Sequence, residues 1–369
     1  MSTPGRRAES WTRAALAPPR AHGAPLPWVE LKSEPEDFHV EETLSFTPSG
    51  DGPHWLLRIE KRAANTRWVA AELARLAGVP VGDVGYAGLK DRHAVTVQWF
   101  SVPSRAQPAE FWRGVHSGEF RVLDVQANLR KLKRGALSGN RFRIRLRQVA
   151  WSREQLDLKL AALGAYGAPN YFGPQRFGRD GYNLDRVAHW LQSGEAPRGR
   201  SERGFALSAA RSLIFNAVLA RRVQAGDWSR LEPGDLASLD GSGSHFRVVA
   251  VDDELRRRLD AFDIHPSGPL WGRGEPESSG HSLDVERGVA REFQAVADLL
   301  AGEHLAQERR ALRCAVRDLG VEADAGTLTL RFSLGRGQFA TAVLREICDF
   351  TAGPLLESDE DDLRGFAAP

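Results

Sequence analysis

The chain has 369 residues, of which 42% are hydrophobic and 27% charged, a composition typical of a folded globular protein with more than one domain. Its two cysteines, Cys314 and Cys348, are far apart, and its ten histidines include no two at metal-ligand spacing on one helix. We therefore expect no disulfide framework, no metal and no cofactor that needs one. No apolar run approaches the roughly 20 residues that cross a bilayer, which favours a cytoplasmic protein without a membrane anchor.

The first 27 residues are rich in Pro, Ala, Gly and Arg and predict a loose basic arm. Residues 28 to about 150 have mainly strand-like patterns. They are interrupted by one clear helix from Thr66 to Ala77, for which Asn65 is the expected N-cap and Gly78 the expected end. Its buried stripe is predicted to be Val69, Leu73 and Leu76.

A charged loop between two apolar runs follows this helix. Gly85 and Gly88 permit a tight turn, and residues 95–100 alternate as a strand requires. A rigid strand directly after a tight loop would hold Asp91 in one orientation. This segment alone fits an ordinary hairpin tip with solvated charges as well as it fits a catalytic carboxylate.

Basic residues are concentrated between positions 121 and 147, where nine Lys and Arg stand against the single acid Asp124. Residues 140–147 alternate strictly, so Arg141, Arg143, Arg145 and Arg147 share one face of a predicted strand. Like charges in such a row repel unless an anion is near. A phosphate backbone would satisfy them, although a solvated charged face is the competing interpretation.

The other face of the same strand carries Asn140 and Phe142. A turn asparagine and a core phenylalanine are the ordinary interpretation of this pair. An aromatic ring beside an amide is also how proteins hold a single nucleobase.

Helical patterns dominate after residue 151, at 153–165, 183–193, 205–224 and 286–302, with a Gly, Ser and Pro-rich passage at 264–282. Strand character returns at 327–332, followed by a predicted helix at 341–350 and an acidic tail at 357–369. The glycines at 335 and 337 imitate a dinucleotide-binding loop, but too few residues follow to complete that fold.

Several motifs in this order resemble the TruD family of tRNA pseudouridine synthases. They are residues 32–42, the Gly88-x-Lys90-Asp91 segment that runs on to Thr96 and Gln98, and residues 135–142, 169–178, 207–212 and 339–346. The resemblance implies an α+β fold: a pseudouridine-synthase-like catalytic domain with a mixed or antiparallel sheet, formed by residues 28–165 and 313–356. A largely helical α+β domain, residues 166–312, would be inserted into it.

The resemblance also implies isomerisation of uridine 13 of tRNA to pseudouridine, without cofactor or metal. Asp91 would act as nucleophile at C1′ or as base at C2′, and Lys32 would keep it ionised. Phe142 would stack on the uracil, and Asn140 would form a hydrogen bond within the site. A flipped base would leave its stack at a cost of a few kcal/mol, offset by phosphate contacts.

The RNA-binding residues would include Arg141, Arg143, Arg145, Arg147 and, in the inserted domain, Arg176 and Arg211. Lys90 is expected to be either a phosphate contact or a structural ion pair, and Arg176 and Arg211 could equally be structural. The partner would be tRNA, with no obligate protein partner and a monomeric enzyme. Two other classes compete: a non-catalytic RNA-binding or chaperone protein, which would not need Asp91, Lys32, Asn140 and Phe142 together, and a base-acting hydrolase.

Overall fold

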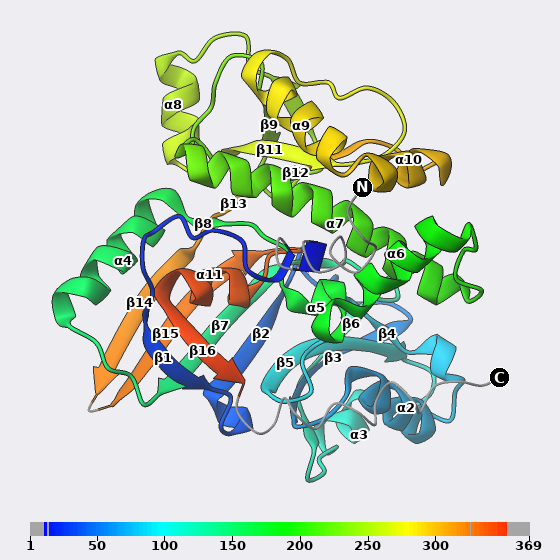
Figure 1. Cartoon of the computed structure of the whole chain (residues 1–369). Helices are drawn as coiled ribbons and strands as arrows, with labels where there is room; N and C mark the ends of the chain where they lie inside the picture. Colours follow the sequence, from blue (N-terminus) through cyan, green and yellow to red (C-terminus); the bar gives the residue numbers. More distant parts are fainter. Residues whose placement is uncertain (1–10, 13–14, 325, 353–369) are drawn as a thin grey trace. The chain divides into compact units, whose positions relative to one another are not determined.

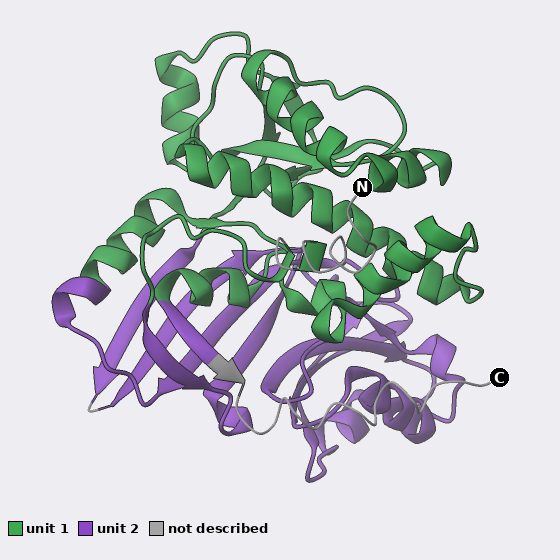
Figure 2. Cartoon of the chain, viewed as in Figure 1, with its two compact units in different colours: residues 1–25, 157–315, 338–347 green, residues 26–156, 316–337, 348–369 purple. Residues whose placement is uncertain are grey.

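The computed structural model describes residues 11–12, 15–324 and 326–352. The chain divides into two compact units (Figures 1 and 2). Unit 1 comprises residues 1–25, 157–315 and 338–347, and unit 2 comprises residues 26–156, 316–337 and 348–369. The expected domain boundaries stay predictions, and they differ from these units chiefly in assigning residues 338–347 to the catalytic domain.

Unit 2 is built on a 10-stranded mixed sheet whose main order is β14-β15-β7-β2-β5-β3-β6. Its strands are β1 (Leu26–Leu31), β2 (Phe38–Leu44), β3 (His54–Arg62), β4 (Gly85–Tyr86), β5 (Val95–Pro103), β6 (Phe120–Asn128), β7 (Leu137–Arg147), β14 (Arg317–Asp324), β15 (Thr327–Gly335) and β16 (Cys348–Ala352). The β1–β16 and β2–β5 pairs are parallel, and the other pairs are antiparallel. The predicted α+β class with a mixed sheet is confirmed.

Helix α2 (Thr66–Ala77) of unit 2 has the predicted bounds. The Asn65 side chain accepts a hydrogen bond from the Arg67 N–H, and Gly78 ends the helix in the left-handed conformation, with φ 66°. Val69 and Leu73 are buried as predicted, whereas Leu76 is only partly buried. With the short helix α3 (Ala109–Arg113), α2 packs on β3, β5 and β6 and closes a hydrophobic core around Leu57, Ile59 and Phe100 (Figure 1).

Unit 1 is mainly helical, with two small sheets. Its helices are α4 (Arg153–Tyr166, whose first residues lie in unit 2), α5 (Pro174–Phe177), α6 (Tyr182–Ser193), α7 (Arg200–Ala225), α8 (Asp253–Asp260), α9 (Gly280–Glu292), α10 (Gln294–Gly302) and α11 (Ala340–Ile347). Its strands are β8 (Ala168–Pro169), β9 (Leu236–Leu239), β10 (His245–Arg247), β11 (Ile264–Leu270), β12 (Glu308–Ala311) and β13 (Arg313–Cys314). Short 3-10 turns lie at Pro35–Asp37 and Val81–Asp83 in unit 2 and at Arg179–Gly181 in unit 1. Helix α7 supplies more of the core of this unit than any other element, and it packs against α6, α9 and α10.

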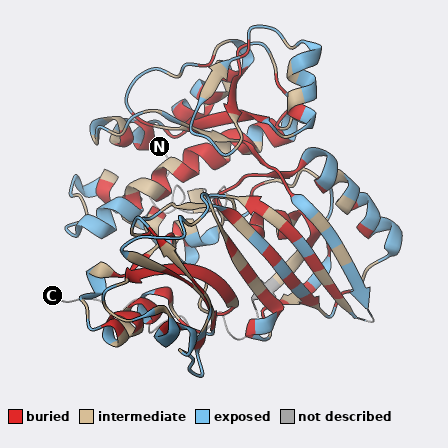
Figure 3. Ribbon diagram, turned by 180° about the vertical axis from the view of Figure 1, so that it is seen from behind, coloured by how far each residue is buried: buried red, intermediate tan, exposed pale blue. Residues whose placement is uncertain are grey.

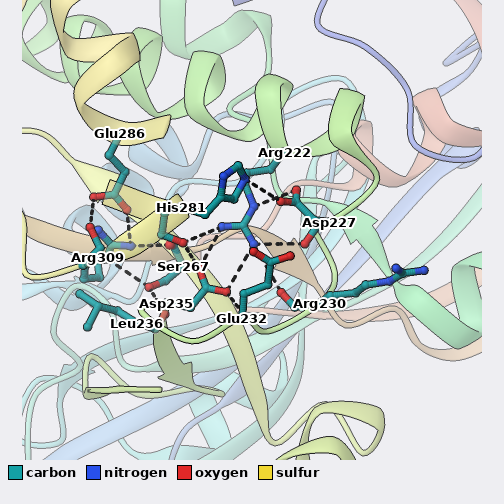
Figure 4. A network of polar contacts seen from close by, with 12 residues as sticks. Arg222, Asp227, Arg230, Glu232, Asp235, Leu236, Ser267, His281, Glu286 and Arg309 are labelled. Atoms are coloured by element: carbon teal, nitrogen blue, oxygen red, sulfur yellow. Dashed lines mark hydrogen bonds and ion pairs between the residues drawn. The ribbon is translucent and has the colours of Figure 1, made fainter. Parts of the chain in front are cut away.

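A buried ionic network fastens α7 to its surroundings in unit 1 (Figure 4). Arg222 is 2% exposed; its guanidinium lies 2.9 Å from Asp235 Oδ1 and 2.8 Å from Asp227 Oδ1. The Ser282 hydroxyl donates to Asp235, and Arg309 forms an ion pair with Glu286 at 2.9 Å. Because every member of this cluster is matched by an opposite charge or a hydrogen bond, burial does not leave an isolated charge.

The predicted loose arm is wrong for its described part. Ala15 is buried in the core of unit 1, and the Ala21 and His22 N–H groups donate to Glu346 at 2.9 and 3.1 Å. Apolar side chains of the arm, among them Trp11 and Leu16, pack against the hydrophobic core of unit 1. The composition of the arm alone does not predict this contact. Residues 1–10, 13–14 and the acidic tail lie outside the described residues.

Three predicted elements also need correction. The last helix ends at Ile347, because residues from Cys348 onward join β1 as a parallel strand. The Gly, Ser and Pro-rich passage contains β11, in which Pro266 and Pro269 are tolerated between β9 and β12. The predicted helix at 286–302 is two helices, with a break at Phe293, where the backbone is no longer helical.

Candidate active site

The loop that carries Asp91 is tied to its surroundings by hydrogen bonds. The Lys90 N–H donates to Thr66 Oγ1 at 3.1 Å, and the Thr66 hydroxyl donates to Gln98 Oε1 at 2.8 Å. The Gln98 amide in turn donates to the Gly88 carbonyl at 3.2 Å. The first turn of α2 and the buried face of β5 therefore fix the loop on both sides.

Lys32 forms an ion pair with Asp91 of this loop, as the resemblance led us to expect. Lys32 follows the end of β1 with φ 62°, a left-handed conformation that is uncommon for residues other than glycine. Its ammonium also lies 4.4 Å from the centre of the Phe38 ring. The other carboxylate oxygen of Asp91 accepts the His93 N–H at 2.9 Å. The Asp91 side chain is still 21% exposed, so a substrate can reach it.

Phe142 and Asn140 lie on the face of β7 that carries the apolar side chains, as predicted. The Phe142 ring packs against Phe332, with centroids 5.3 Å apart, and meets Phe38 edge to face at 6.2 Å. Contacts thus run without a break from Asp91 through Lys32 and Phe38 to Phe142. Asn140 Oδ1 is buried and accepts no hydrogen bond from any described residue. An unpaired buried acceptor is costly, so a donor from solvent or from a bound ligand would stabilise it.

Lys90 forms a structural ion pair, the second of the two alternatives left open by the sequence. Its ammonium lies 2.7 Å from Glu42 Oε2, and the two side chains are 7% and 0% exposed. Glu42 also accepts the Trp99 N–H at 3.3 Å. This burial leaves Lys90 poorly placed to contact a phosphate.

The arginine face of β7 differs from the expectation at Arg147. Arg141, Arg143 and Arg145 are exposed, as their alternation predicts (Figure 3 shows this alternation along the strands). Arg147 instead binds Asp37 through two hydrogen bonds of 2.9 Å, so a carboxylate of the protein itself satisfies it. The three exposed arginines point away from the side of the sheet on which Phe142 lies, as the strict alternation predicts.

Arg176 and Arg211, both in unit 1, are held by neighbours within that unit. Arg176 donates to Ser208 Oγ at 2.6 Å and lies over the Phe172 ring. Arg211 donates to the Leu270 and Ala306 carbonyls and forms an ion pair with Glu308 at 3.2 Å. Burial lowers the pKa of both guanidinium groups. These contacts fit the structural alternative for both residues.

Glu42 and Lys61 are among the buried charged residues of unit 2 to which the sequence motifs gave no role. A signal was present in the alternation of each strand. Lys61 shares its face of β3 with Leu57 and Ile59, and Glu42 shares its face of β2 with Phe38. A charged residue at an apolar position of a strand needs a partner, and here both partners lie in the Asp91 loop.

One group of side chains in unit 1 has the composition of a metal site. Ligand atoms of Asp227, Glu232 and His281 lie within 4.8 Å of one another (Figure 4). The Asp227 carboxylate, however, already binds Arg222, whose positive charge opposes a second cation there. The donor set fits the ionic network better than a metal ion.

No helix among the described residues combines the length and apolar character needed to cross a bilayer.

The fold and the sequence both match known proteins. The family model of tRNA pseudouridine synthase D (TruD) matches residues 28–198 and 203–347. A solved chain from Methanosarcina mazei, provisionally named tRNA pseudouridine synthase D, has a TM-score of 0.72 at 22% identity and covers 90% of this chain and 96% of its own. The fold is therefore that of a TruD protein.

Curated relatives named tRNA pseudouridine synthase D are considerably more similar in sequence. The protein of Nitrosococcus oceani is 47% identical over 326 residues, covering 88% of this chain and 91% of its own. The protein of Methylococcus capsulatus is 47% identical over 335 residues, covering 90% of this chain and 94% of its own. The chain belongs to the TruD family of tRNA pseudouridine synthases, which confirms the resemblance drawn from its motifs.

Proposed function

We propose that this protein converts a uridine of tRNA, at position 13, to pseudouridine. The observation that carries the proposal is the ion pair of Lys32 and Asp91, held at the end of a continuous set of aromatic contacts that includes Phe142. Relatives named tRNA pseudouridine synthase D cover most of the chain and support the substrate class. The choice of position 13 rests on the family resemblance alone.

In the proposed reaction the bond between uracil N1 and ribose C1′ breaks, the base turns, and C5 joins C1′. The C5 hydrogen leaves as a proton and N1 gains one, so the isomerisation balances without an oxidant, a reductant or a cofactor. Asp91 would act at C1′ as nucleophile or at C2′ as base. Lys32 would keep the carboxylate ionised when RNA excludes water from the site.

Two further groups would hold the detached base. Asn140 Oδ1 would accept a hydrogen bond from a uracil N–H, which satisfies an acceptor that no described residue satisfies. Phe142 would offer a ring for stacking. Because Phe332 covers one side of that ring, the uracil would have to approach from the other side.

Phosphate contacts would offset the cost of flipping the base, a few kcal/mol. Arg141, Arg143 and Arg145 are proposed for this role because they are exposed and no described residue forms an ion pair with them. Since they lie on the sheet face opposite Phe142, they would bind a part of the tRNA other than the flipped nucleotide. A cytoplasmic monomer is expected for such an enzyme.

The test is incubation of the metal-stripped protein with unmodified tRNA transcripts, followed by pseudouridine mapping at single-nucleotide resolution. The proposal predicts one new pseudouridine, at position 13. Modification at another position would correct the site only. Tight tRNA binding without any product would favour a non-catalytic RNA-binding protein, and loss of the base would favour a hydrolase.

A further inference from the structure

Lys61 is a fully buried lysine that touches the main chain of Asp91. It lies near the end of β3, is 0% exposed, and donates hydrogen bonds to the Ala64 carbonyl at 2.6 Å and the Asp91 carbonyl at 2.9 Å. No carboxylate of the described residues forms an ion pair with it. Both of its bonds go to main-chain oxygens, one in its own turn and one 30 residues away in the Asp91 loop.

Burying the charged Lys61 side chain costs free energy, and a purely structural contact does not require a charge at this position. A buried lysine without a carboxylate partner is disfavoured, and burial lowers the pKa of Lys61 to about 8. The charge of Asp91 acts in the opposite direction and that of Lys90 adds to the lowering.

We propose that Lys61 is a positioning residue for the reaction, because it fixes the peptide unit of Asp91 through its carbonyl. This inference rests on the proposed function. Three groups then act on Asp91. Lys32 binds one carboxylate oxygen and the His93 N–H binds the other. Lys61 binds the main-chain carbonyl of the same residue. With the backbone held, the carboxylate has one orientation toward the ribose.

The ammonium of Lys61 also adds a second buried positive charge beside Asp91. Lys32 is the direct partner and approaches from the end of β1, whereas Lys61 approaches from β3. A cation in a water-poor environment stabilises a carboxylate more strongly than it would in water. Lys61 would therefore support both the geometry and the ionised state of Asp91 without touching the substrate.

The experiment compares Lys61→Met with wild type in two measurements. The first is the single-turnover rate of pseudouridine formation together with the dissociation constant for tRNA. A displaced carboxylate should lower the rate on the order of 100-fold, while tRNA affinity changes less than about twofold. The second is hydrogen exchange of the His93 amide, which donates to Asp91 and should exchange at least about tenfold faster when the loop is released.

Lys159→Met is the matched control. Lys159 is also buried, at 7% exposure, and its ammonium also donates to two main-chain carbonyls, of His22 and Glu346, at 3.1 and 3.0 Å. All three of these residues belong to unit 1. Its loss should change neither the rate nor His93 exchange by more than about twofold. Lys61→Gln keeps an N–H donor without the charge and should therefore be faster than Lys61→Met. Its rate of pseudouridine formation should be about tenfold below that of wild type. If Lys61→Met does not fold, Lys61→Gln replaces it in both measurements.

The outcomes separate this inference from the proposed function. If wild type forms no pseudouridine, the proposed function is wrong, and His93 exchange still tests whether Lys61 holds the loop. If wild type is active and a folded Lys61 variant matches it in both rate and exchange, Lys61 is not a positioning residue. Equal losses in the Lys61 and Lys159 variants would likewise reduce its role to general stability.

Discussion

The buried pair of Lys90 and Glu42 gives a stability prediction that can be worked from the structure. The two charges are 2.7 Å apart, and their side chains are 7% and 0% exposed. At an effective dielectric constant of about 20, the attraction is about 6 kcal/mol before desolvation is subtracted. Removing one partner leaves the other charge buried and unpaired, which typically costs about 3–5 kcal/mol.

We therefore expect Lys90→Met to lower the free energy of unfolding by about 3–5 kcal/mol. In Lys90→Met combined with Glu42→Gln the loss should be much smaller than the sum of the two single losses, because no charge is left unpaired. Gln at position 42 keeps an oxygen for the Trp99 N–H, so the cycle isolates the charge interaction. Urea unfolding followed by tryptophan fluorescence measures each variant.

The matched control is the exposed pair of Arg75 and Glu72 on α2, which has a similar separation of 2.9 Å. Its coupling energy should be about 0.5 kcal/mol or less, because water screens it. A coupling of that small size for Lys90 and Glu42 would refute the assignment of a structural ion pair. So would a loss of tRNA affinity, with a smaller salt dependence, in the double variant that keeps the fold.

Three further predictions follow from the exposed arginines, the unpaired amide and the buried thiol. Arg143→Gln with Arg145→Gln should reduce the slope of log affinity against log salt by roughly 1.4–1.8, since each lost phosphate contact contributes about 0.7–0.9; affinity titrations from low to high salt measure it. Asn140→Leu should lower the rate of pseudouridine formation by at least about tenfold, because the uracil N–H loses its acceptor, while tRNA affinity persists in a gel-shift assay. Burial raises the pKa of Cys314 to about 12, so alkylation by iodoacetamide at pH 8 should modify it only after unfolding, as mass spectrometry would show.

Controls sharpen these three tests. Arg75→Gln with Arg113→Gln removes exposed arginines that already have carboxylate partners, Glu72 and Glu110, and should leave the salt slope unchanged. If the slope of log affinity against log salt is the same in the Arg143 and Arg145 variant as in wild type, these arginines do not contact phosphate and form a solvated face. Undiminished turnover in Asn140→Leu would remove the amide from base recognition, and rapid alkylation of folded protein would contradict the buried state of Cys314.

Local sequence signals predicted the elements whose determinants are themselves local. Helix Thr66–Ala77 needs only its cap at Asn65, its apolar stripe and Gly78 to be defined. The alternation of residues 140–147 likewise fixed which side chains of β7 are buried. For these elements the burial pattern follows directly from the period of the backbone.

Long-range pairing decided the elements that the sequence did not predict. Residues 348–350 look helical in sequence, yet β1 recruits them into a parallel pair. Arg147 resembles its neighbours in the arginine row, but only the fold brings Asp37 to it. Lys61 occupies an apolar position of its strand, but only the folded loop shows that its partner is the Asp91 carbonyl.

The candidate site shows the same division. Motif order pointed to Lys32, Asp91, Asn140 and Phe142, and the structure brings Lys32 against Asp91 and links that pair to Phe142 through Phe38. That the arginine row lies on the opposite face from Phe142 was predicted from strand parity, and the burial pattern of β7 confirms it. That Lys90 is buried against Glu42 could not be predicted in this way, because it depends on how β2 lies beside the loop.

The most direct test of the central claim is pseudouridine mapping on tRNA treated with the Asp91→Asn variant beside wild type. Asn is nearly isosteric with Asp but has neither its charge nor its nucleophilic or basic oxygen. We predict that wild type modifies position 13 and that the variant binds the same tRNA with similar affinity and forms no pseudouridine. Full activity of Asp91→Asn would contradict the mechanism.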